Sequence, residues 1–190
     1  MHNKTIGFCM CGSFCTLKSV IEQIRALKSL GADILPIMSE TVYSTDTRFG
    51  TAEYFINEVT EICERPIIHT ITGAEPIGPK ELLDLLVIAP CTGNTLGKLA
   101  NGITDTSVTL AAKAHLRNER PVVVAVSSND SLSASAKNIG ALLNTKGYYF
   151  VPFRQDAPYS KHRSCVADFS LIPQTVYNAF SGEQLQPIIT

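Results

Sequence analysis

The sequence lacks both a large net charge and a long uninterrupted run of apolar residues. Its 190 residues include 16 Lys and Arg against 17 Asp and Glu, a formal net charge of −1, and 45% of them are hydrophobic. A nucleic-acid binder that relies on electrostatics usually has a basic excess, and a disordered chain combines few apolar residues with a high net charge. No run approaches the roughly 18 apolar residues of a membrane span. We therefore expect a folded cytoplasmic protein that binds neither nucleic acid nor membranes.

The sequence also lacks the cysteine spacing that is typical of metal sites. Its six cysteines include no CxxC pair: Cys9, Cys11, Cys15, Cys63, Cys91 and Cys165. The apolar stretch 6–11 is too short for a secretory signal, so we expect reduced thiols rather than disulfides. The first two cysteines would share one face of a strand and the third would lie on the next helix, with no fourth ligand nearby. We expect thiols that fill space in the core and no metal site; a thiolate-bound metal is the less favoured alternative.

Apolar runs that suit strands alternate with residues at helical spacing along the whole chain. We expect strands at 5–11, 34–38, 66–71, 82–89, 121–126 and 148–153, and helices at 17–30, 52–63, 95–118 with a break at 101–102, 131–144 and 173–180. Unalternated apolar runs suit parallel strands that are buried on both faces. The order predicts an α/β, doubly wound, Rossmann- or flavodoxin-like fold with a mostly parallel sheet of about six strands between two helical layers.

The length and the loops complete the architecture. Roughly 100 to 200 residues form one domain, so residues 1–190 are expected to be a single domain in which 165–190 is a C-terminal tail with a short helix. Ligands of such folds bind beyond the carboxyl ends of the strands. The loops to inspect are therefore those that follow the predicted strands.

The first two of these loops each have two interpretations. The first contains Gly12 and Ser13 but lacks the GxGxxG pattern of dinucleotide-binding turns. A serine at a helix start can hold one phosphate, or it can simply cap the helix. After the second run, Glu40 lies where an NAD enzyme would place its ribose-binding carboxylate, but the missing glycines argue against a dehydrogenase. Ser39 can be the functional residue there, although an ordinary solvated loop is the simpler interpretation.

The most specific stretch is residues 89–105, which reads APCTGNTLGKLANGITD. Together with the Gly12–Ser13 turn, it resembles the flavin-binding family of homo-oligomeric cysteine decarboxylases and flavin prenyltransferases. The resemblance covers nearly the whole chain and is strongest in this motif. It implies an FMN protein that assembles as a trimer or a larger shell such as a dodecamer, with the flavin at the boundary between protomers.

The resemblance also implies site residues. The expected cofactor-binding residues are Gly12, Ser13, Ser39, Pro90, Thr92, Gly93, Asn94, Thr95, Lys98, Ser128 and Asn129. In the family's decarboxylases an asparagine after the next strand meets the substrate carboxylate, and Asn129 holds that place. Two departures limit the transfer. Val126 to Ser128 and Leu132 replace the family's proline- and methionine-containing elements, and Pro76 stands where the cysteine decarboxylases have a histidine, so decarboxylation of a cysteinyl peptide is not expected.

A basic cluster follows the last predicted strand and contains Arg154, Lys161, His162 and Arg163. Charged loops are usually solvated surface, but a guanidinium is well matched to a carboxylate through paired hydrogen bonds. If the loop binds a dicarboxylate, Arg154, Tyr159 and Arg163 join Asn129 as substrate-binding candidates. For a general base we name His162 first and His69 second; the latter can also be an ordinary half-buried strand histidine.

Within this family, the full-length likeness implies an oxidoreductase-type subunit. It would bind FMN and act with a second, nicotinamide-binding subunit, through which NADP could enter, to form a pyridine dicarboxylate in the mother cell of a sporulating bacterium. Two alternatives stay open. One is a stand-alone flavin-dependent decarboxylase or prenyltransferase, and the other is a scaffold that has lost its flavin.

Overall fold

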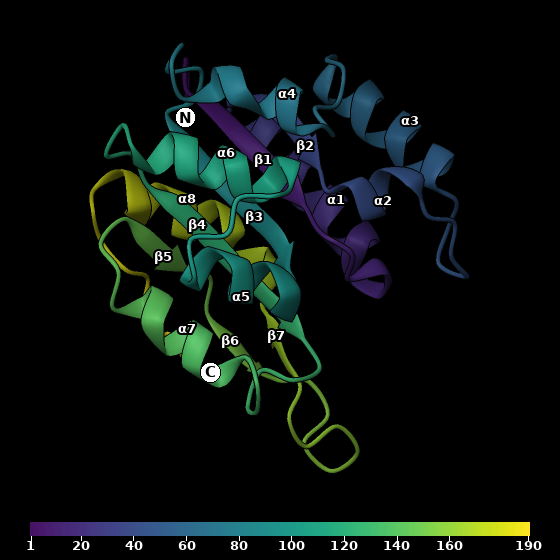
Figure 1. Cartoon of the computed structure of the whole chain (residues 1–190), viewed down its shortest axis with the longest axis vertical. Coiled ribbons are helices and arrows are strands. Elements are labelled where there is room, and N and C mark those ends of the chain that lie inside the picture. The colour runs from purple at the N-terminus through teal and green to yellow at the C-terminus, as the bar shows by residue number, and fades with distance from the viewer.

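A computed structural model describes all residues, 1–190, and contains one seven-stranded sheet between layers of helices (Figure 1). The strands are β1 (Thr5–Met10), β2 (Asp33–Met38), β3 (Leu85–Cys91), β4 (Val122–Ser128), β5 (Tyr148–Phe150), β6 (Phe153–Gln155) and β7 (Cys165–Ala167). The helices are α1 (Leu17–Ser29), α2 (Glu40–Ser44), α3 (Ala52–Cys63), α4 (Ile71–Ala74), α5 (Gly93–Ala100), α6 (Ser107–Leu116), α7 (Ala136–Leu143) and α8 (Ile172–Phe180). The predicted α/β, doubly wound, flavodoxin-like fold is confirmed.

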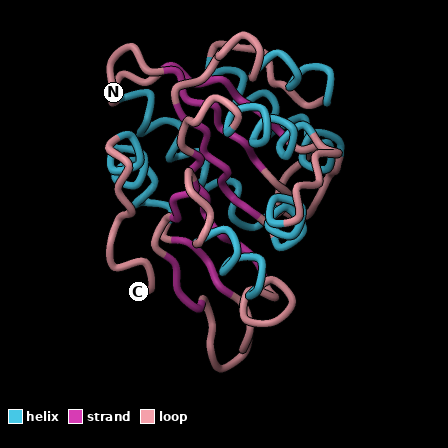
Figure 2. Tube along the Cα trace, turned by 60° about the vertical axis from the view of Figure 1, so that its left-hand side comes forward, coloured by secondary structure: helices cyan, strands magenta, loops and turns pink.

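The sheet has a parallel part and an antiparallel extension. Its order is β2-β1-β3-β4-β7-β6, with β5 paired to β4 as well. The first half of β4 pairs parallel with β5, and its end, at Ser127 and Ser128, pairs antiparallel with β7. Pro152 has no N–H group to continue the β5 ladder, so the chain leaves β4 there and forms the β6–β7 hairpin. This hairpin, whose loop projects at the lower end of the molecule in Figures 1 and 2, is the part that the sequence did not predict.

The core follows from the parallel pairing. All seven residues of β3 are buried, and Figure 2 shows helices on both sides of the central strands. Apolar positions of α1, such as Val20, Ile24 and Leu27, are buried at helical spacing against this sheet. One continuous cluster of buried hydrophobic side chains results, and it leaves the carboxyl ends of β1, β3 and β4 to the loops.

Three predictions about the elements need correction. Residues 66–71 do not form a strand; only Ile68 makes a bridge to Ile37, because Pro66 lacks an N–H and Thr70 already caps α4, its hydroxyl accepting from the Gly73 N–H. Cys15 lies in a 3₁₀ turn before α1 rather than in the helix. The helix expected from residue 131 begins at Ala136, because the preceding residues turn around the carbonyl of Asp130.

Two further observations concern the cysteines and the helices. The six cysteines are unpaired, and all except Cys15 are buried. None of the helices has the length and apolar character needed to cross a membrane.

The segment from residue 165, expected to be a tail, contributes β7 to the sheet before it forms α8.

Candidate functional site

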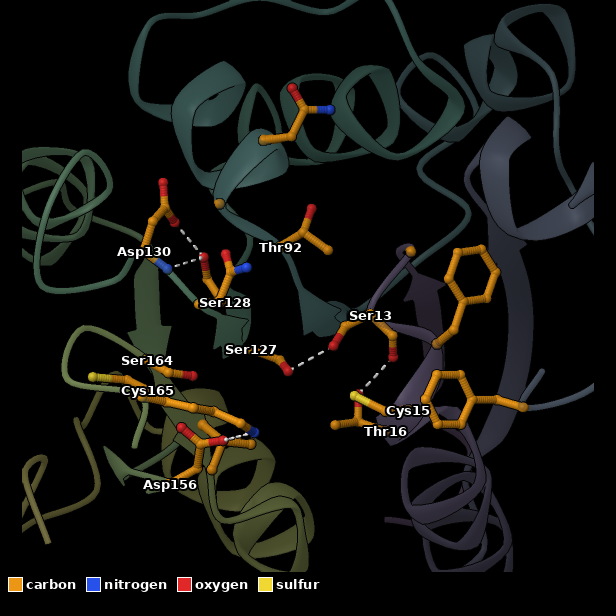
Figure 3. A pocket seen from close by; sticks show the side chains of 18 residues that line it. Ser13, Cys15, Thr16, Thr92, Ser127, Ser128, Asp130, Asp156, Ser164 and Cys165 are labelled. Atoms are coloured by element: carbon orange, nitrogen blue, oxygen red, sulfur yellow. Dashed lines mark hydrogen bonds and ion pairs between the residues drawn. The ribbon is translucent and has the colours of Figure 1, made fainter. Parts of the chain in front are cut away.

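A cavity of about 610 Å³ lies at the carboxyl ends of β1 and β4 and at the start of α5 (Figure 3). A second cavity of about 270 Å³ adjoins it, and the two share Gly12, Thr92 and Asn94. The loops after three neighbouring parallel strands meet at this edge of the sheet, which is where doubly wound folds bind ligands. The predicted location of the site agrees with the position of both cavities.

Hydroxyl groups from two strands meet at the floor of the larger cavity. The Oγ atoms of Ser13, after β1, and Ser127, at the end of β4, are 2.8 Å apart and share a hydrogen bond. The Thr16 hydroxyl donates to the Ser13 carbonyl at 2.8 Å and holds the turn closed. Ser13 caps no helix with its side chain, so its hydroxyl faces the cavity region instead, as Figure 3 shows. The Ser13 side chain therefore lines the cavity and does not cap a helix.

The loop after β3 is organised by threonines. Thr92 caps α5, its Oγ1 accepting from the Thr95 N–H at 3.4 Å and lying 3.2 Å from the Thr95 Oγ1. Thr95 in turn donates to the Cys11 Sγ at 3.3 Å. Burial raises the pKa of the Cys11 thiol to about 11, so this thiol stays protonated at neutral pH. Cys11 is thus a packing residue that supports the loop from below.

Asp130 is fixed beside the start of α5. Its Oδ1 accepts hydrogen bonds from the hydroxyls of Ser128 and Ser135, the latter at 2.8 Å. Gly93, the first residue of α5, lies against this group: a Cβ built on it would be 2.6 Å from Asp130 Oδ1 and 2.7 Å from Ser135 Oγ. Only glycine lets the helix approach the carboxylate so closely.

The smaller cavity brings together Ser39, Thr95 and Lys98. Ser39 caps α2, and the Lys98 Nζ pairs with Asp105 at 2.7 Å. Glu40 also borders this cavity, but its Oε1 accepts from the Ser107 N–H at 3.1 Å, at the first turn of α6. The Glu40 carboxylate therefore accepts a hydrogen bond from the first turn of α6. This structural role does not depend on the binding of a ribose.

Two aromatic rings border the larger cavity. Phe14 follows the first turn, and Phe49 belongs to the connection between α2 and α3. Phe49 is 37% exposed although it is a large apolar residue. Aromatic side chains beside a small number of polar groups are typical of the lining of ligand pockets.

Comparison with known proteins places the chain in a family. The model of the family described as Flavoprotein matches residues 1–171. The chain belongs to the Flavoprotein family. It is 44% identical over 189 residues to the B subunit of dipicolinate synthase of Bacillus subtilis (strain 168), covering 100% of this chain and 94% of that protein.

Solved structures agree with this assignment. The crystal structure of the dipicolinate synthase B subunit from Bacillus halodurans matches the flavoprotein with a TM-score of 0.92 and 45% identity, over 100% of this chain and 97% of that one. The FMN-dependent cysteine decarboxylase SpaF matches with a TM-score of 0.71 and 20% identity, over 93% and 97% of the two chains. At that identity the second likeness concerns the fold alone.

Most of the expected cofactor-binding residues of the flavoprotein meet at the two cavities. Gly12, Ser13, Thr92, Gly93, Asn94, Ser128 and Asn129 line the larger one, and Ser39, Thr95 and Lys98 line the smaller one. Pro90 is buried inside β3 and lines neither cavity. The motif at 89–105, together with the rule that ligands bind at the carboxyl ends of the strands, therefore points to the part of the chain that lines the two cavities.

The two histidines named as candidate general bases, His69 and His162, line neither cavity. The His69 ring stacks on Tyr43, with centroids 3.5 Å apart, and its Nδ1 is 3.4 Å from the Ile67 carbonyl oxygen. His162 is exposed on the β6–β7 loop, with its Nδ1 2.7 Å from the carbonyl oxygen of Pro158. In this chain neither imidazole borders the space where a ligand would bind.

The expected substrate-binding residues divide in the same way. Asn129 lines the larger cavity, whereas Arg154, Tyr159 and Arg163 do not. Tyr159 is 95% exposed, and the Arg154 guanidinium is 3.9 Å from Asp168. Arg154 belongs to β6 and the other two lie on the β6–β7 loop, outside the cavity lining.

Sequence reasoning missed several lining residues as individuals. Asp130 and Ser127 flank the predicted pair Ser128 and Asn129, so their place after β4 could have indicated them. Phe49 gives no such signal because it lies ten residues after Ser39, beyond the short helix α2, and matches no motif. Asp156 comes from the β6–β7 loop, whose path depends on a hairpin that the apolar pattern does not show. Lys161, from the same loop, belongs to the predicted basic cluster but was not named as a substrate contact.

Proposed function

We propose that this flavoprotein is the FMN-binding B subunit of a dipicolinate synthase. It would form pyridine-2,6-dicarboxylate from a dihydrodipicolinate or hydroxy-tetrahydrodipicolinate precursor, together with a nicotinamide-binding A subunit. The single observation that carries the proposal is the 44% identity, over the full chain, to the Bacillus subtilis protein of that name. Because the match covers nearly the whole of both chains, it leaves little room for a different set of loops.

The residues at the site fit FMN in size and in donor chemistry. A volume of about 610 Å³ lies in the range of roughly 300 to 1,000 Å³ that is usual for cofactor pockets. We propose that the hydroxyls of Ser13, Ser39, Thr92 and Thr95 and the Asn94 amide hold the phosphate and the ribityl chain. Phe14 and Phe49 would cover the ring system and exclude water from it.

The chemistry suits such a site. Loss of two electrons makes a dihydropyridine aromatic, and a flavin supplies an acceptor for a hydride. The chain's own part would be to bind the substrate, orient its ring and keep water out. We retain Asn129, Arg154, Tyr159 and Arg163 as proposed substrate contacts and His162, then His69, as proposed general bases. Because the histidines lie outside the cavities of a single chain, each would need another chain or a different loop position to act.

The proposed setting includes other chains. A dodecameric FMN-dependent decarboxylase from Escherichia coli O157:H7 has the same fold, with a TM-score of 0.62. Exposed apolar side chains such as Ile103 and Leu132, which are 46% and 51% exposed, suit a surface that is covered in an oligomer. We therefore propose a trimer or dodecamer of this chain that binds the A subunit, in the mother-cell cytoplasm during spore formation.

The alternative of a stand-alone decarboxylase has less support. Pro76, which takes the place of the family's histidine, lies in the 3₁₀ turn Glu75–Ile77 and borders neither cavity. A prenyltransferase would need a cationic and tyrosine set inside the cavity, and Tyr159 and Arg163 do not line it. Activity of the purified chain without the A subunit would favour these alternatives.

Titration of the purified chain with FMN tests the proposal. We expect one FMN to bind per chain, with a shift of the visible flavin bands and quenching of flavin fluorescence. Ser13→Ala should weaken FMN binding about tenfold, the effect of losing one hydrogen bond to a charged group. Ser19→Ala, on the exposed face of α1, is the matched control. Absence of any FMN uptake by the wild-type chain would remove every flavin-dependent function at once, and turnover of the precursor with the A subunit then tests the reaction.

A further inference from the structure

Lys161 is the only cationic side chain among the residues that line the larger cavity. The other ionisable groups there are the carboxyls of Asp130 and Asp156 and two thiols, and the remaining polar groups are hydroxyls and amides. An anionic ligand would be repelled by the two carboxylates unless a positive charge offsets them. Lys161 is the residue placed to supply that charge.

Backbone hydrogen bonds fix the position of Lys161 within the β6–β7 loop. Its N–H donates to the Ala157 carbonyl at 2.6 Å, and its own carbonyl accepts from the Ser164 N–H at 3.0 Å. The next residues are anchored as well: Gln155 donates to the His162 carbonyl, and the Leu132 N–H donates to the carbonyl of Arg163. The loop is thereby joined to the segment after β4, and the lysine is held over the cavity.

The neighbouring basic residues are directed elsewhere. The His162 ring is tied to the carbonyl oxygen of Pro158 at 2.7 Å, and Arg154 lies near Asp168. Of the four residues of the basic cluster, only Lys161 borders the cavity. The cluster is thus not uniform, and one member has a different environment from the others.

Lys161 is paired with a group that an incoming anion can replace. Its Nζ is 2.9 Å from Asp156 Oδ2, and the two side chains are 60% and 23% exposed. The hydrogen bond with Asp156 raises the pKa of Lys161. Burial acts to raise the pKa of Asp156, but hydrogen bonds from Lys161 and Ser164 outweigh it and lower that pKa. Both groups are charged at neutral pH, and solvent-exposed ion pairs contribute little to stability.

Lys161 is set apart from those proposed FMN contacts that line the smaller cavity. Ser39, Thr95 and Lys98 line the smaller cavity, which Lys161 does not border. In Figure 3, Asp156 lies on the β6–β7 side of the larger cavity, away from Thr92 at the start of α5. Because Lys161 pairs with Asp156, its charge lies on the β6–β7 side of the larger cavity, away from the proposed FMN contact Thr92.

We propose that Lys161 binds a carboxylate of the substrate and makes the site selective for a pyridine dicarboxylate over a monocarboxylate. In the absence of substrate, the Asp156 carboxylate pairs with the Lys161 ammonium group and positions it. This inference rests on the proposed function, because that function supplies a dicarboxylate as the ligand.

Calorimetric titration with pyridine-2,6-dicarboxylate and with pyridine-2-carboxylate tests the inference on the FMN-loaded chain. Wild type should prefer the diacid, and Lys161→Gln should weaken diacid binding about tenfold while it changes monoacid binding much less. Asp156→Asn should act in the opposite direction and tighten diacid binding several-fold, because it removes a competing carboxylate. Lys80→Gln, an exposed lysine before β3 at the opposite end of the sheet, is the control and should change neither affinity.

Two outcomes would overturn the inference. One is a wild-type chain without preference for the diacid, and the other is a Lys161→Gln variant that keeps the preference, including one that weakens the binding of both acids equally. FMN retention, measured by absorbance in the same samples, separates the failures. A loss of FMN in Lys161→Gln would assign the lysine to the cofactor phosphate instead. If wild type bound no FMN, the proposed function would fail, and the titrations of the cofactor-free chain would still decide the role of Lys161.

Discussion

Gly93 shows how one residue determines the shape of the site. Its φ angle is unremarkable for a helix, so the requirement for glycine comes from the space around it rather than from its backbone conformation. The atoms it would collide with are Asp130 Oδ1, Ser135 Oγ and Ser128 Oγ, which belong to one hydrogen-bonded group. A side chain here would move the start of α5 away from the loop after β4.

Gly93→Ala should therefore disturb both stability and FMN binding. We expect a loss of about 1 to 3 kcal/mol in the free energy of unfolding, typical of overpacking, and FMN affinity about tenfold weaker. Urea unfolding and FMN titration measure the two effects.

The control is Gly97→Ala on the same helix. A Cβ at Gly97 would meet only Asn138 Nδ2, at 3.5 Å, which is ordinary contact. Because alanine is the better helix former, this variant should gain roughly 0.5 to 1 kcal/mol and keep its FMN affinity. Equal behaviour of the two variants would contradict the role given to Gly93.

At the scale of elements, the start of α6 depends on a residue from another part of the chain. Thr106 and Thr109 form a reciprocal cap, and Glu40 Oε1 accepts the N–H of Ser107 from outside the helix. Ser107 also donates its hydroxyl to the Met38 carbonyl at 2.7 Å, so α6 is joined to the end of β2. A carboxylate near a helix start is favourable because the first N–H groups point toward it.

Glu40→Gln separates this structural task from ligand binding. The free energy of unfolding should fall by about 0.5 to 1.5 kcal/mol, because a charged acceptor is replaced by a neutral one. FMN affinity should stay the same or rise, since a negative charge beside the proposed phosphate end is removed. Weaker FMN binding with unchanged stability, measured in the same two assays, would return Glu40 to a ribose-binding role.

The longer helices were predictable from their apolar spacing, whereas the short helices α2 and α4 were not, although a polar side chain caps each of them. Residues 66–71 combine apolar character with β-branched residues, which favour a strand when only the local pattern is considered. The actual outcome depends on Thr70, whose hydroxyl caps α4, and on the edge strand β2, whose bridge to this segment is limited to Ile37 and Ile68. Neither of these contacts is visible in the local pattern.

At the scale of the whole molecule, His115 couples the core to pH. It lies in the last turn of α6, 1% exposed, with Nε2 3.1 Å from the Pro121 carbonyl oxygen. Burial lowers its pKa to about 4 from an ordinary value of 6.5. Because the pKa of His115 is lower in the folded chain than in the unfolded chain, the unfolded chain binds more protons between pH 4 and pH 6.5. Stability is therefore full above pH 6.5 and is lost as the pH falls toward 4.

From pH 7 to pH 5, this histidine alone should lower the free energy of unfolding by about 2 kcal/mol. His115→Gln keeps a donor for the Pro121 carbonyl but does not titrate. The difference in unfolding free energy between wild type and variant should therefore shrink by that amount over the same interval, as measured by urea unfolding at each pH. A constant difference would show that His115 is accessible to protons in the folded state.

The sequence by itself determined the layered α/β fold, the central strands and the general place of the site. Periodic apolar runs reflect burial on both faces, and the carboxyl edge follows from parallel pairing, so Ser13, Thr92 and Asn94 could be placed together before any contact was known. Only the tertiary structure decided which side chains enter the cavity. The β6–β7 hairpin forms through long-range pairing with β4, and its loop turns Lys161 inward while Arg154, Tyr159 and Arg163 stay outside. The sequence shows which side chains are charged but not where each of them points, because that depends on the backbone hydrogen bonds that fix each loop.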